Sequence, residues 1–409
     1  MLAYIIGVVL FALGIGLAVA LHEAGHMLTA KAFGMKVRRY FIGFGPKVFS
    51  FRRGETEYGL KIIPAGGFCD IAGMTALDEV TPEEAPRAMW RYPVWKRFVV
   101  LVSGSVTHFI LGFVILYVMA ITSGLINLQD TPQISGVANC AQSVANPNTN
   151  PVTYQPCGPG SPAPAKNAGL QAGDLIVSVG GKATPTWTDV TTAVQKLHGV
   201  TPFVIQRDGK DMTLNIDVAT VQSIPVSRQS SQNPKLAAVG AIGVTHNNLV
   251  TYSALGGFGG ALGYTGQMFV GVWDGLMSLP GRIPNLVTSI GGGHRDPNGV
   301  MSVVGAARLG GQTVQNGVWS LFWLLLASLQ FFFGAFNLLP LLPLDGGHIA
   351  VAFYEKIRNW FRSLRGRPIG SPVDYTKLAP LTVLVVVVFG AMVLLSVTAD
   401  IVNPIQLGG

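Results

Sequence analysis

The residues best suited to chemistry lie near the start of the chain, in residues 21–26. His22 and His26 are four residues apart, so on an α-helix they project from the same face. Two imidazoles one helical turn apart can hold a single zinc ion. Glu23 is rotated about a hundred degrees from His22 around the helix, so it borders the metal and does not bind it. A carboxylate there can accept a proton from water that the metal activates.

His22, Glu23 and His26 match the H-E-x-x-H pattern completely. The alternative interpretation is a chance match of two structural histidines, because short motifs recur by accident. This copy, however, closes the uncharged apolar run 1–20. Ionisable groups in a membrane-spanning helix cost on the order of 3 kcal/mol each when charged, so those that occur there tend to be functional. The pattern therefore favours a zinc site inside a membrane span.

A second polar stretch closes a later apolar run and supplies the missing ligand. Asn337 and Asp345 lie at the end of that run. An amide and a carboxylate are costly to place there, so those that occur tend to be functional. Asp345 would complete a two-histidine, one-carboxylate zinc site whose fourth position is left for water. Pro340 and Pro343 are expected to break the helix and to leave carbonyl groups free beside a polar cavity.

Composition limits the class of protein that must position these residues. The chain has 409 residues, of which 49% are hydrophobic and 12% charged, and its mean hydropathy is +0.44. These values exclude an ordinary soluble enzyme and a disordered tail. The net charge of +8 could suggest nucleic acid, but 12 of the 28 Lys and Arg lie in residues 31–97. By the positive-inside rule that segment is cytoplasmic, both termini lie outside, and no nucleic-acid partner is expected.

The expected fold is an α-helical polytopic membrane protein with about four transmembrane helices. It also has a cytoplasmic membrane-associated β-hairpin and one extracytoplasmic PDZ-like α+β domain. No basic residue precedes the first apolar run, which is therefore read as a retained span and not a cleaved signal peptide. The expected segments are the first span with H-E-x-x-H at 1–30, a cytoplasmic loop with the hairpin at 31–97, the second span at 98–125, the PDZ-like domain at 126–222, an extracytoplasmic linker with an interfacial amphipathic helix at 223–317, the third span at 318–345, a cytoplasmic loop at 346–380 and the fourth span at 381–400.

The hairpin is predicted from two apolar stretches, 47–51 and 57–63, with a turn at 52–55. It is either a hairpin of no special role or an edge strand that pairs with an extended substrate by β-augmentation. In the extracytoplasmic region, Ala168-Gly169-Leu170-x-x-Gly173-Asp174 resembles a signature of PDZ domains attached to bacterial proteases; an unrelated small β-domain is the alternative. A short helix is expected at 189–197, with Thr188 as its N-cap.

Residues 252–273 lack charge and are long enough to span, yet they are Gly-rich and amphipathic. The His pair and Asp345 must lie at the same depth, and an extra crossing would put the basic residues after Asp345 outside. This segment is therefore expected at the outer interface. His108 is the one ionisable residue of the second span, and we expect a neutral imidazole bonded to a neighbouring helix.

The three cysteines are divided between two compartments in this topology. Cys140 and Cys157 lie in the outward segment, in a Pro- and Asn-rich stretch that cannot build much core. An oxidising compartment permits a disulfide between them, although two free thiols are the alternative. Cys69 lies on the cytoplasmic side and is expected to stay reduced.

Taken with these motifs, the chain resembles the site-2 protease family of intramembrane zinc metalloproteases, and most closely the actinobacterial regulators of intramembrane proteolysis. The resemblance covers nearly the whole chain. It rests on residues 22–26, 43–46, 64–70, 302–305 and 337–347 together with one PDZ-like domain. Two departures stand out: residues 104–108 read Gly-Ser-Val-Thr-His where the family often has Gly-Pro-x-x-Asn, and the second proline of the later motif falls at Pro343, one residue late.

The resemblance implies one zinc ion on His22, His26 and Asp345, with Glu23 as general base. It implies that Asn337 contacts the substrate backbone or the developing oxyanion. It further implies that the hairpin and the backbone around four glycines guide an extended substrate; these are Gly43, Gly45, Gly66 and Gly67.

The partners implied are the lipid bilayer and single-pass membrane proteins, typically anti-sigma factors already cleaved outside by another protease. The location implied is a bacterial cell membrane. Two other functions compete with this one. A catalytically inactive scaffold would have a closed structural metal site and a partner-binding PDZ domain. A metal transporter would need polar residues along a path, whereas the second and fourth spans offer only His108.

Overall fold

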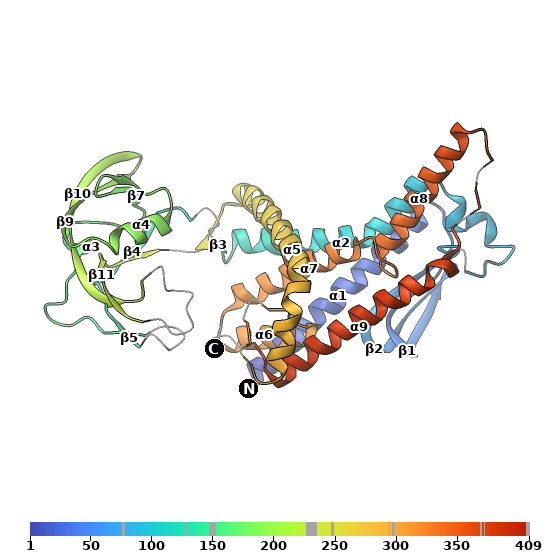
Figure 1. Cartoon of the computed structure of the whole chain (residues 1–409), viewed down its shortest axis with the longest axis horizontal. Coiled ribbons are helices and arrows are strands. Elements are labelled where there is room, and N and C mark those ends of the chain that lie inside the picture. The colour runs from blue at the N-terminus through green and yellow to red at the C-terminus, as the bar shows by residue number, and fades with distance from the viewer. Residues whose placement is uncertain are drawn as a thin grey trace. The chain divides into compact units, whose positions relative to one another are not determined.

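The computed structural model describes all residues except 76–77, 127–129, 147–152, 226–234, 247–248, 294, 297–298, 369, 372 and 406–409. Parts of the expected extracytoplasmic region fall in these gaps. The chain divides into two compact units. The first consists of the described residues within 1–119 and 258–405 and carries the candidate site; the second consists of those within 120–257. Figure 1 shows the elements of both.

The first unit is a helical bundle with a small sheet at one end of α1. Its helices are α1 (Leu2–Ala32), α2 (Val94–Ile121), α5 (Ala254–Ile290), α6 (Val303–Gln315), α7 (Trp319–Asn337), α8 (Asp345–Leu364) and α9 (Ala379–Val402), with short 3-10 turns at Ala85–Arg87, Met89–Arg91 and Tyr375–Leu378. In the described part of the chain, four helices are long and apolar enough to cross a membrane: Leu2–Ala32, Val94–Ile121, Trp319–Asn337 and Tyr375–Val402. These four helices fit a polytopic membrane protein.

Helix ends differ from the expected spans where proline or glycine decides them. α2 begins at Val94, directly after Pro93, and the chain turns at Gly124, which has a φ of +85°. α7 stops at Asn337, before Pro340, so the third span is shorter than the expected 318–345. Asp345 consequently lies in the first turn of α8 and not at the end of the third span.

Residues 223–317 were expected to form a linker with one helix, and the residues of this segment that the structure describes form two. α5 packs on α2 and α7, since Phe269 contacts Phe109 and Phe331 through their rings. α6 packs on α1 through small residues: a side chain at Gly7 would meet Gly310 and Gly311 at 2.9 Å. Small residues permit this close approach of two helix backbones.

The sheet of the first unit is formed by β1 (Val37–Arg53) and β2 (Thr56–Ile71), which pair antiparallel. The paired region is longer than the two short strands predicted at 47–51 and 57–63. Both strands bend, so that Tyr40 is paired with Tyr58 on one side and with Cys69 on the other. Residues 67–70 therefore pair with the first part of β1, and the predicted turn joins the distal ends of the strands.

The second unit is built around a five-stranded sheet with strand order β11-β10-β9-β7-β8. Its elements are β3 (Leu125–Ile126), β4 (Ile134–Val137), β5 (Val144–Asn146), β6 (Thr153–Tyr154), α3 (Pro164–Asn167), β7 (Leu175–Val179), β8 (Lys182–Ala183), α4 (Trp187–Val194), β9 (Gly199–Arg207), β10 (Lys210–Ser223), β11 (Ala237–Ala241), β12 (Val244–His246) and β13 (Leu249–Val250). The N-cap of α4 is Thr186, not Thr188, because Thr186 and Asp189 form a capping box. A disulfide joins Cys140 to Cys157.

The Ala-Gly-Leu-x-x-Gly-Asp stretch forms a tight corner before β7. Asp174 is almost fully buried, accepts a hydrogen bond from the Gln171 amide and forms a two-point ion pair with Arg207. Burial by itself would raise the pKa of Asp174, but the Arg207 guanidinium outweighs it and the pKa is lowered. Gly169 and Gly173 have positive φ angles of +78° and +98°, which explains glycine at both positions.

Candidate metal centre

His22 and His26 lie on one face of α1, as their spacing predicts. The run before them contains no proline, so the helix continues unbroken from Leu2 through both residues. Both histidines are buried, with 8% and 7% of the residue surface exposed. Their Nε2 atoms are 3.1 Å apart. The two rings thus point at one spot inside the bundle, not toward solvent.

Asp345 reaches the same spot from the start of α8. Its Oδ2 lies 3.2 Å from Nε2 of His22 and 3.3 Å from Nε2 of His26. A carboxylate in the first turn of a helix is favoured by the partial positive charge of the helix N-terminus. Segment 338–344 folds tightly against this turn, because a Cβ at Gly346 would lie 2.2 Å from the Leu339 carbonyl oxygen. Glycine after Asp345 is thus required by backbone packing.

α2 forms the third side of the site with backbone atoms. The Val100 carbonyl accepts a hydrogen bond from Nδ1 of His26 at 2.7 Å. One turn further along α2, Gly104 faces both histidines: a Cβ there would lie 2.4 Å from His26 Nε2 and 2.7 Å from His22 Cε1. Gly104 was not predicted as a site residue. In the sequence it is the glycine that matches the family's Gly-Pro-x-x-Asn pattern, next to the departures at Ser105 and His108.

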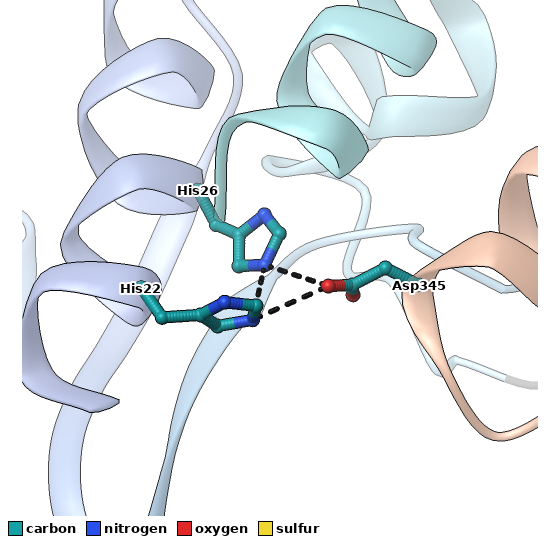
Figure 2. A group of neighbouring side chains, drawn as sticks. All are labelled: His22, His26 and Asp345. Atoms are coloured by element: carbon teal, nitrogen blue, oxygen red, sulfur yellow. Dashed lines mark hydrogen bonds and ion pairs between the residues drawn. The ribbon is translucent and has the colours of Figure 1, made fainter. Parts of the chain in front are cut away.

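The three side chains converge as the donors of a metal site do (Figure 2). Since His26 Nδ1 carries a hydrogen for Val100, the Nε2 of a neutral His26 presents a lone pair. That lone pair faces a second imidazole nitrogen and a carboxylate oxygen, an arrangement that repels unless a cation lies between them. Zinc with ligands at 2.0–2.1 Å in tetrahedral geometry would separate them by about 3.3 Å. The observed separations are 3.1, 3.2 and 3.3 Å, so the residues fit zinc.

Glu23 borders this group and is half-buried. Within the described part of the chain, the group of side chains that could hold a metal ion consists of His22, His26 and Asp345, without Glu23. The carboxylate instead faces β2. A Cβ at Gly67 would lie 3.0 Å from Cγ of Glu23, and the carboxylate interacts with the backbone of Cys69.

Tyr40 fixes the sheet to α1 beside Glu23. Its hydroxyl donates to the Ala20 carbonyl at 2.7 Å. Burial, with a contribution from the Glu23 charge, raises the pKa of Tyr40 to about 12, so the phenol keeps this proton at neutral pH. The strand that passes Glu23 is therefore held in a fixed register against the helix that carries the histidines.

The other predicted residues occupy different places. Asn337 ends α7, and segment 338–344 leads from it to Asp345. Gly43, Gly45 and Gly66 have positive φ angles of +88°, +82° and +142° and lie where β1 and β2 bend. Cys140 and Cys157 belong to the second unit.

His108 bonds a neighbouring helix, as expected: its Nδ1 is 2.8 Å from Oε1 of Gln330 on α7. Gln330 was not predicted, although a lone amide within an apolar helix is a recognisable signal.

Comparison with known proteins identifies the family. A family model described as Peptidase family M50 matches residues 10–381. The chain belongs to peptidase family M50. It is 46% identical over 409 residues to "Zinc metalloprotease Rip1" of Mycobacterium tuberculosis strain H37Rv, with 99% of each chain covered. It is 47% identical over 407 residues to the protein of the same name from Mycolicibacterium smegmatis, with 98% of each covered.

A more distant relative is the "Regulator of sigma-W protease RasP" of Bacillus subtilis, 24% identical over 439 residues, with 88% of this chain and 91% of the relative covered. The present chain is accordingly a zinc metalloprotease of the site-2 protease family. Its cofactor is zinc, and the four long apolar helices among its described residues are consistent with intramembrane proteolysis.

Proposed function

We propose that this M50 protease hydrolyses a peptide bond within single-pass transmembrane proteins such as anti-sigma factors, in transmembrane stress signalling. The observation that carries the proposal is the convergence of His22, His26 and Asp345 within a bundle of apolar helices. The substrate class is supported by the relative from Bacillus subtilis, whose name describes it as a regulator of sigma-W. Substrates would arrive already shortened outside the membrane by another protease.

In this proposal His22, His26 and Asp345 hold the zinc ion. When bound, the ion acts as a Lewis acid on water and on the scissile carbonyl. The Glu23 carboxylate takes a proton from the attacking water and delivers it to the leaving amine. The side-chain amide of Asn337, at the end of α7, donates a hydrogen bond to the developing oxyanion.

The substrate must be extended before it is cut, because helical hydrogen bonds shield its carbonyl groups. The bent part of the sheet, with Gly43, Gly45, Gly66 and Gly67, would bind an unwound substrate by strand addition. Two observations support this assignment. Gly67 lies directly against Glu23, and residues 67–70 pair with β1 on one side only within the described residues. A strand added at that edge would bring its carbonyl groups next to Glu23.

The surrounding segments follow the same proposal. Residues 31–97 and 346–380 are cytoplasmic, both termini lie outside, and the protein resides in a bacterial cell membrane. The segment 126–222 is a PDZ-like domain that limits substrate size or senses a substrate end. Its support is the buried corner at Asp174 and the helix α4 beside the sheet.

The test reconstitutes purified protein in lipid vesicles with a panel of single-pass substrates, including shortened anti-sigma factors. Wild-type protein is expected to cut within the membrane segment, located by mass spectrometry. Glu23→Gln keeps size and hydrogen bonding but removes the base. It is expected to retain zinc and to lower cleavage at least about a hundredfold.

Three results would contradict parts of the proposal. Unchanged cleavage by Glu23→Gln would remove the assigned base. Loss of zinc from that variant would make Glu23 a ligand or a structural support. A zinc-loaded wild-type protein that cuts no member of the panel would favour the scaffold, in which the metal is structural.

A further inference from the structure

His108 and Gln330 form a buried polar pair beside the metal centre. His108 is 3% exposed and Gln330 is fully buried. His108 belongs to α2 and Gln330 to α7, so the 2.8 Å contact between Nδ1 and Oε1 joins two helices. Polar side chains in an apolar bundle are costly to bury, and such residues are generally retained for a purpose.

The contact fixes which nitrogen of His108 carries the hydrogen. An amide oxygen can only accept, so Nδ1 of His108 must donate to Gln330 Oε1. In the neutral imidazole the other nitrogen, Nε2, then presents a lone pair. His108 is thus prepared to accept a hydrogen bond.

His22 has the complementary need. Its Nε2 faces Asp345 and the metal position, so in the zinc-loaded protein its Nδ1 carries the hydrogen. A metal-bound histidine almost always donates that hydrogen to an acceptor, which sets the ring orientation and strengthens the ligand. His26 does so, to Val100. Nδ1 of His22 is buried and has no hydrogen-bond partner among the described residues.

The ring of His108 is the imidazole that flanks His22 on the α2 side. The two ring centroids are 5.1 Å apart and the planes are tilted by 45°. Since a hydrogen bond joins nitrogen atoms about 3 Å apart, this is close to the separation at which two imidazoles share one. We infer that His108 is a positioning residue: its Nε2 accepts the Nδ1–H of His22 in the metal-loaded protein, and Gln330 holds His108 in the required tautomer.

The inference rests on the ligand set proposed above, and it concerns the position where the chain departs from the family pattern. The resulting series of hydrogen bonds runs from the Gln330 oxygen through both nitrogens of His108 and then through both nitrogens of His22 to the metal. His22 thereby gains an acceptor for its Nδ1 hydrogen, as His26 has in the Val100 carbonyl. For His22 the acceptor is a side chain and not the backbone. Removing it should weaken metal binding without touching a ligand.

The test measures zinc affinity by chelator competition, the visible absorption of the cobalt(II)-substituted protein and the unfolding midpoint of the metal-free protein. His108→Leu should weaken zinc binding about 10- to 100-fold, the usual effect of losing such a partner. His108→Asn should recover most of that loss, because its amide oxygen can accept the hydrogen. Gln330→Met keeps the volume but frees the tautomer and should give an intermediate loss with an altered cobalt spectrum.

Ser105→Ala is the matched control. Ser105 is also buried on α2, and its hydroxyl has no partner among the described residues. Its replacement should leave the zinc affinity and the cobalt spectrum unchanged. His108→Leu and Gln330→Met also break the buried His108–Gln330 bond and should lower the metal-free unfolding midpoint, so the zinc affinity and the cobalt spectrum, and not the stability, are the readouts that decide.

Zinc affinity equal to wild type in His108→Leu would overturn the inference. So would equal losses in His108→Leu and His108→Asn, since the role would then be packing and not acceptance. If His108→Leu does not fold, His108→Asn and Gln330→Met decide: no change in the cobalt spectrum of Gln330→Met would refute the tautomer assignment. By contrast, wild-type zinc binding in His22→Ala would refute the ligand set itself.

Discussion

Replacing Gly104 by alanine should separate folding from metal binding in one step. The added Cβ would lie 2.4 Å from His26 Nε2 and 2.7 Å from His22 Cε1, whereas real Cβ contacts essentially never fall below 3.0 Å. To reach 3.0 Å, the His26 ring must therefore move by about 0.6 Å and the His22 ring by about 0.3 Å, or α2 must withdraw. Zinc–nitrogen distances tolerate only about 0.2 Å, so moving the rings takes at least one imidazole out of range, while withdrawing α2 breaks the Val100 hydrogen bond that orients His26.

The expected loss of zinc affinity is that of losing one ligand while the helix stays folded. Zinc affinity should fall at least about a hundredfold, or about 2.8 kcal/mol at about 1.4 kcal/mol per factor of ten. The metal-free protein should not be destabilised to the same degree, because alanine is favoured over glycine inside a helix by about 0.5–1 kcal/mol. The signature is thus a normal apo protein that no longer binds zinc.

The assay compares the unfolding midpoint with and without excess zinc in detergent, since a ligand that binds the folded state raises the midpoint with its concentration. Gly104→Ala should lose this rise, and chelator competition should give the affinity. The control is Gly16→Ala on α1, where an added Cβ would meet nothing within 4 Å, and it should bind zinc as wild type does. Zinc affinity within a few-fold of wild type in Gly104→Ala would refute the close approach of α2 to the histidines.

Three further perturbations test other parts of the molecule. Asp345→Asn should lower bound zinc and abolish cleavage, because a neutral amide is a poor ligand; metal analysis and a membrane-substrate assay measure both. Replacing Cys140 and Cys157 by serine removes a disulfide that spans a sequence separation of 17. This should lower the free energy of unfolding by about 3 kcal/mol, seen as a lower unfolding transition. Unreduced digests of the wild-type protein should yield the disulfide-linked peptide. Asp400→Asn removes the carboxylate that is 2.6 Å from Arg295 in a buried pair and should destabilise the protein by about 3–5 kcal/mol, measured by thermal unfolding in detergent.

Each of these has its own contradicting result. Wild-type zinc content in Asp345→Asn would remove that residue from the ligand set. Two alkylated cysteines in unreduced wild type would exclude the disulfide. For the buried pair the control is Glu83→Gln, an exposed acidic residue of the same unit; equal unfolding midpoints for the two variants would show that the pair adds no stability.

The apolar helices could be predicted, and a candidate ligand set proposed, because their signals are local. A long apolar run predicts a membrane span whatever packs beside it. That His22 and His26 share one helix face follows from helix periodicity alone. The exact ends were set by prolines: the expected second span began four residues after the helix start that follows Pro93, and the expected third span ran past Pro340. α6 was missed for the opposite reason: its glycines and alanines give little apolar pattern, yet they let it pack on α1.

The rest of the site depends on contacts between helices and could not be predicted. Gln330 is 222 residues from its partner His108, and nothing in either local sequence specifies the pair. Cys69 and Gly67 approach Glu23 because β1 and β2 bend and pair twice. The sequence suggested only a simple hairpin there, since strand propensity says which residues are extended and not where the strand lies.

The chain contains 51 glycines. The sequence alone does not show which of them the candidate metal site requires. Three donor atoms can approach within about 3.3 Å of one another only if the backbones behind them also come close. Gly104 allows this for α2 and Gly346 for α8, where an added Cβ would collide at 2.4 Å and 2.2 Å. Other glycines, such as Gly16, meet nothing within 4 Å. The residue type is identical in all these places, so only the packed structure distinguishes the glycines on which the metal centre depends.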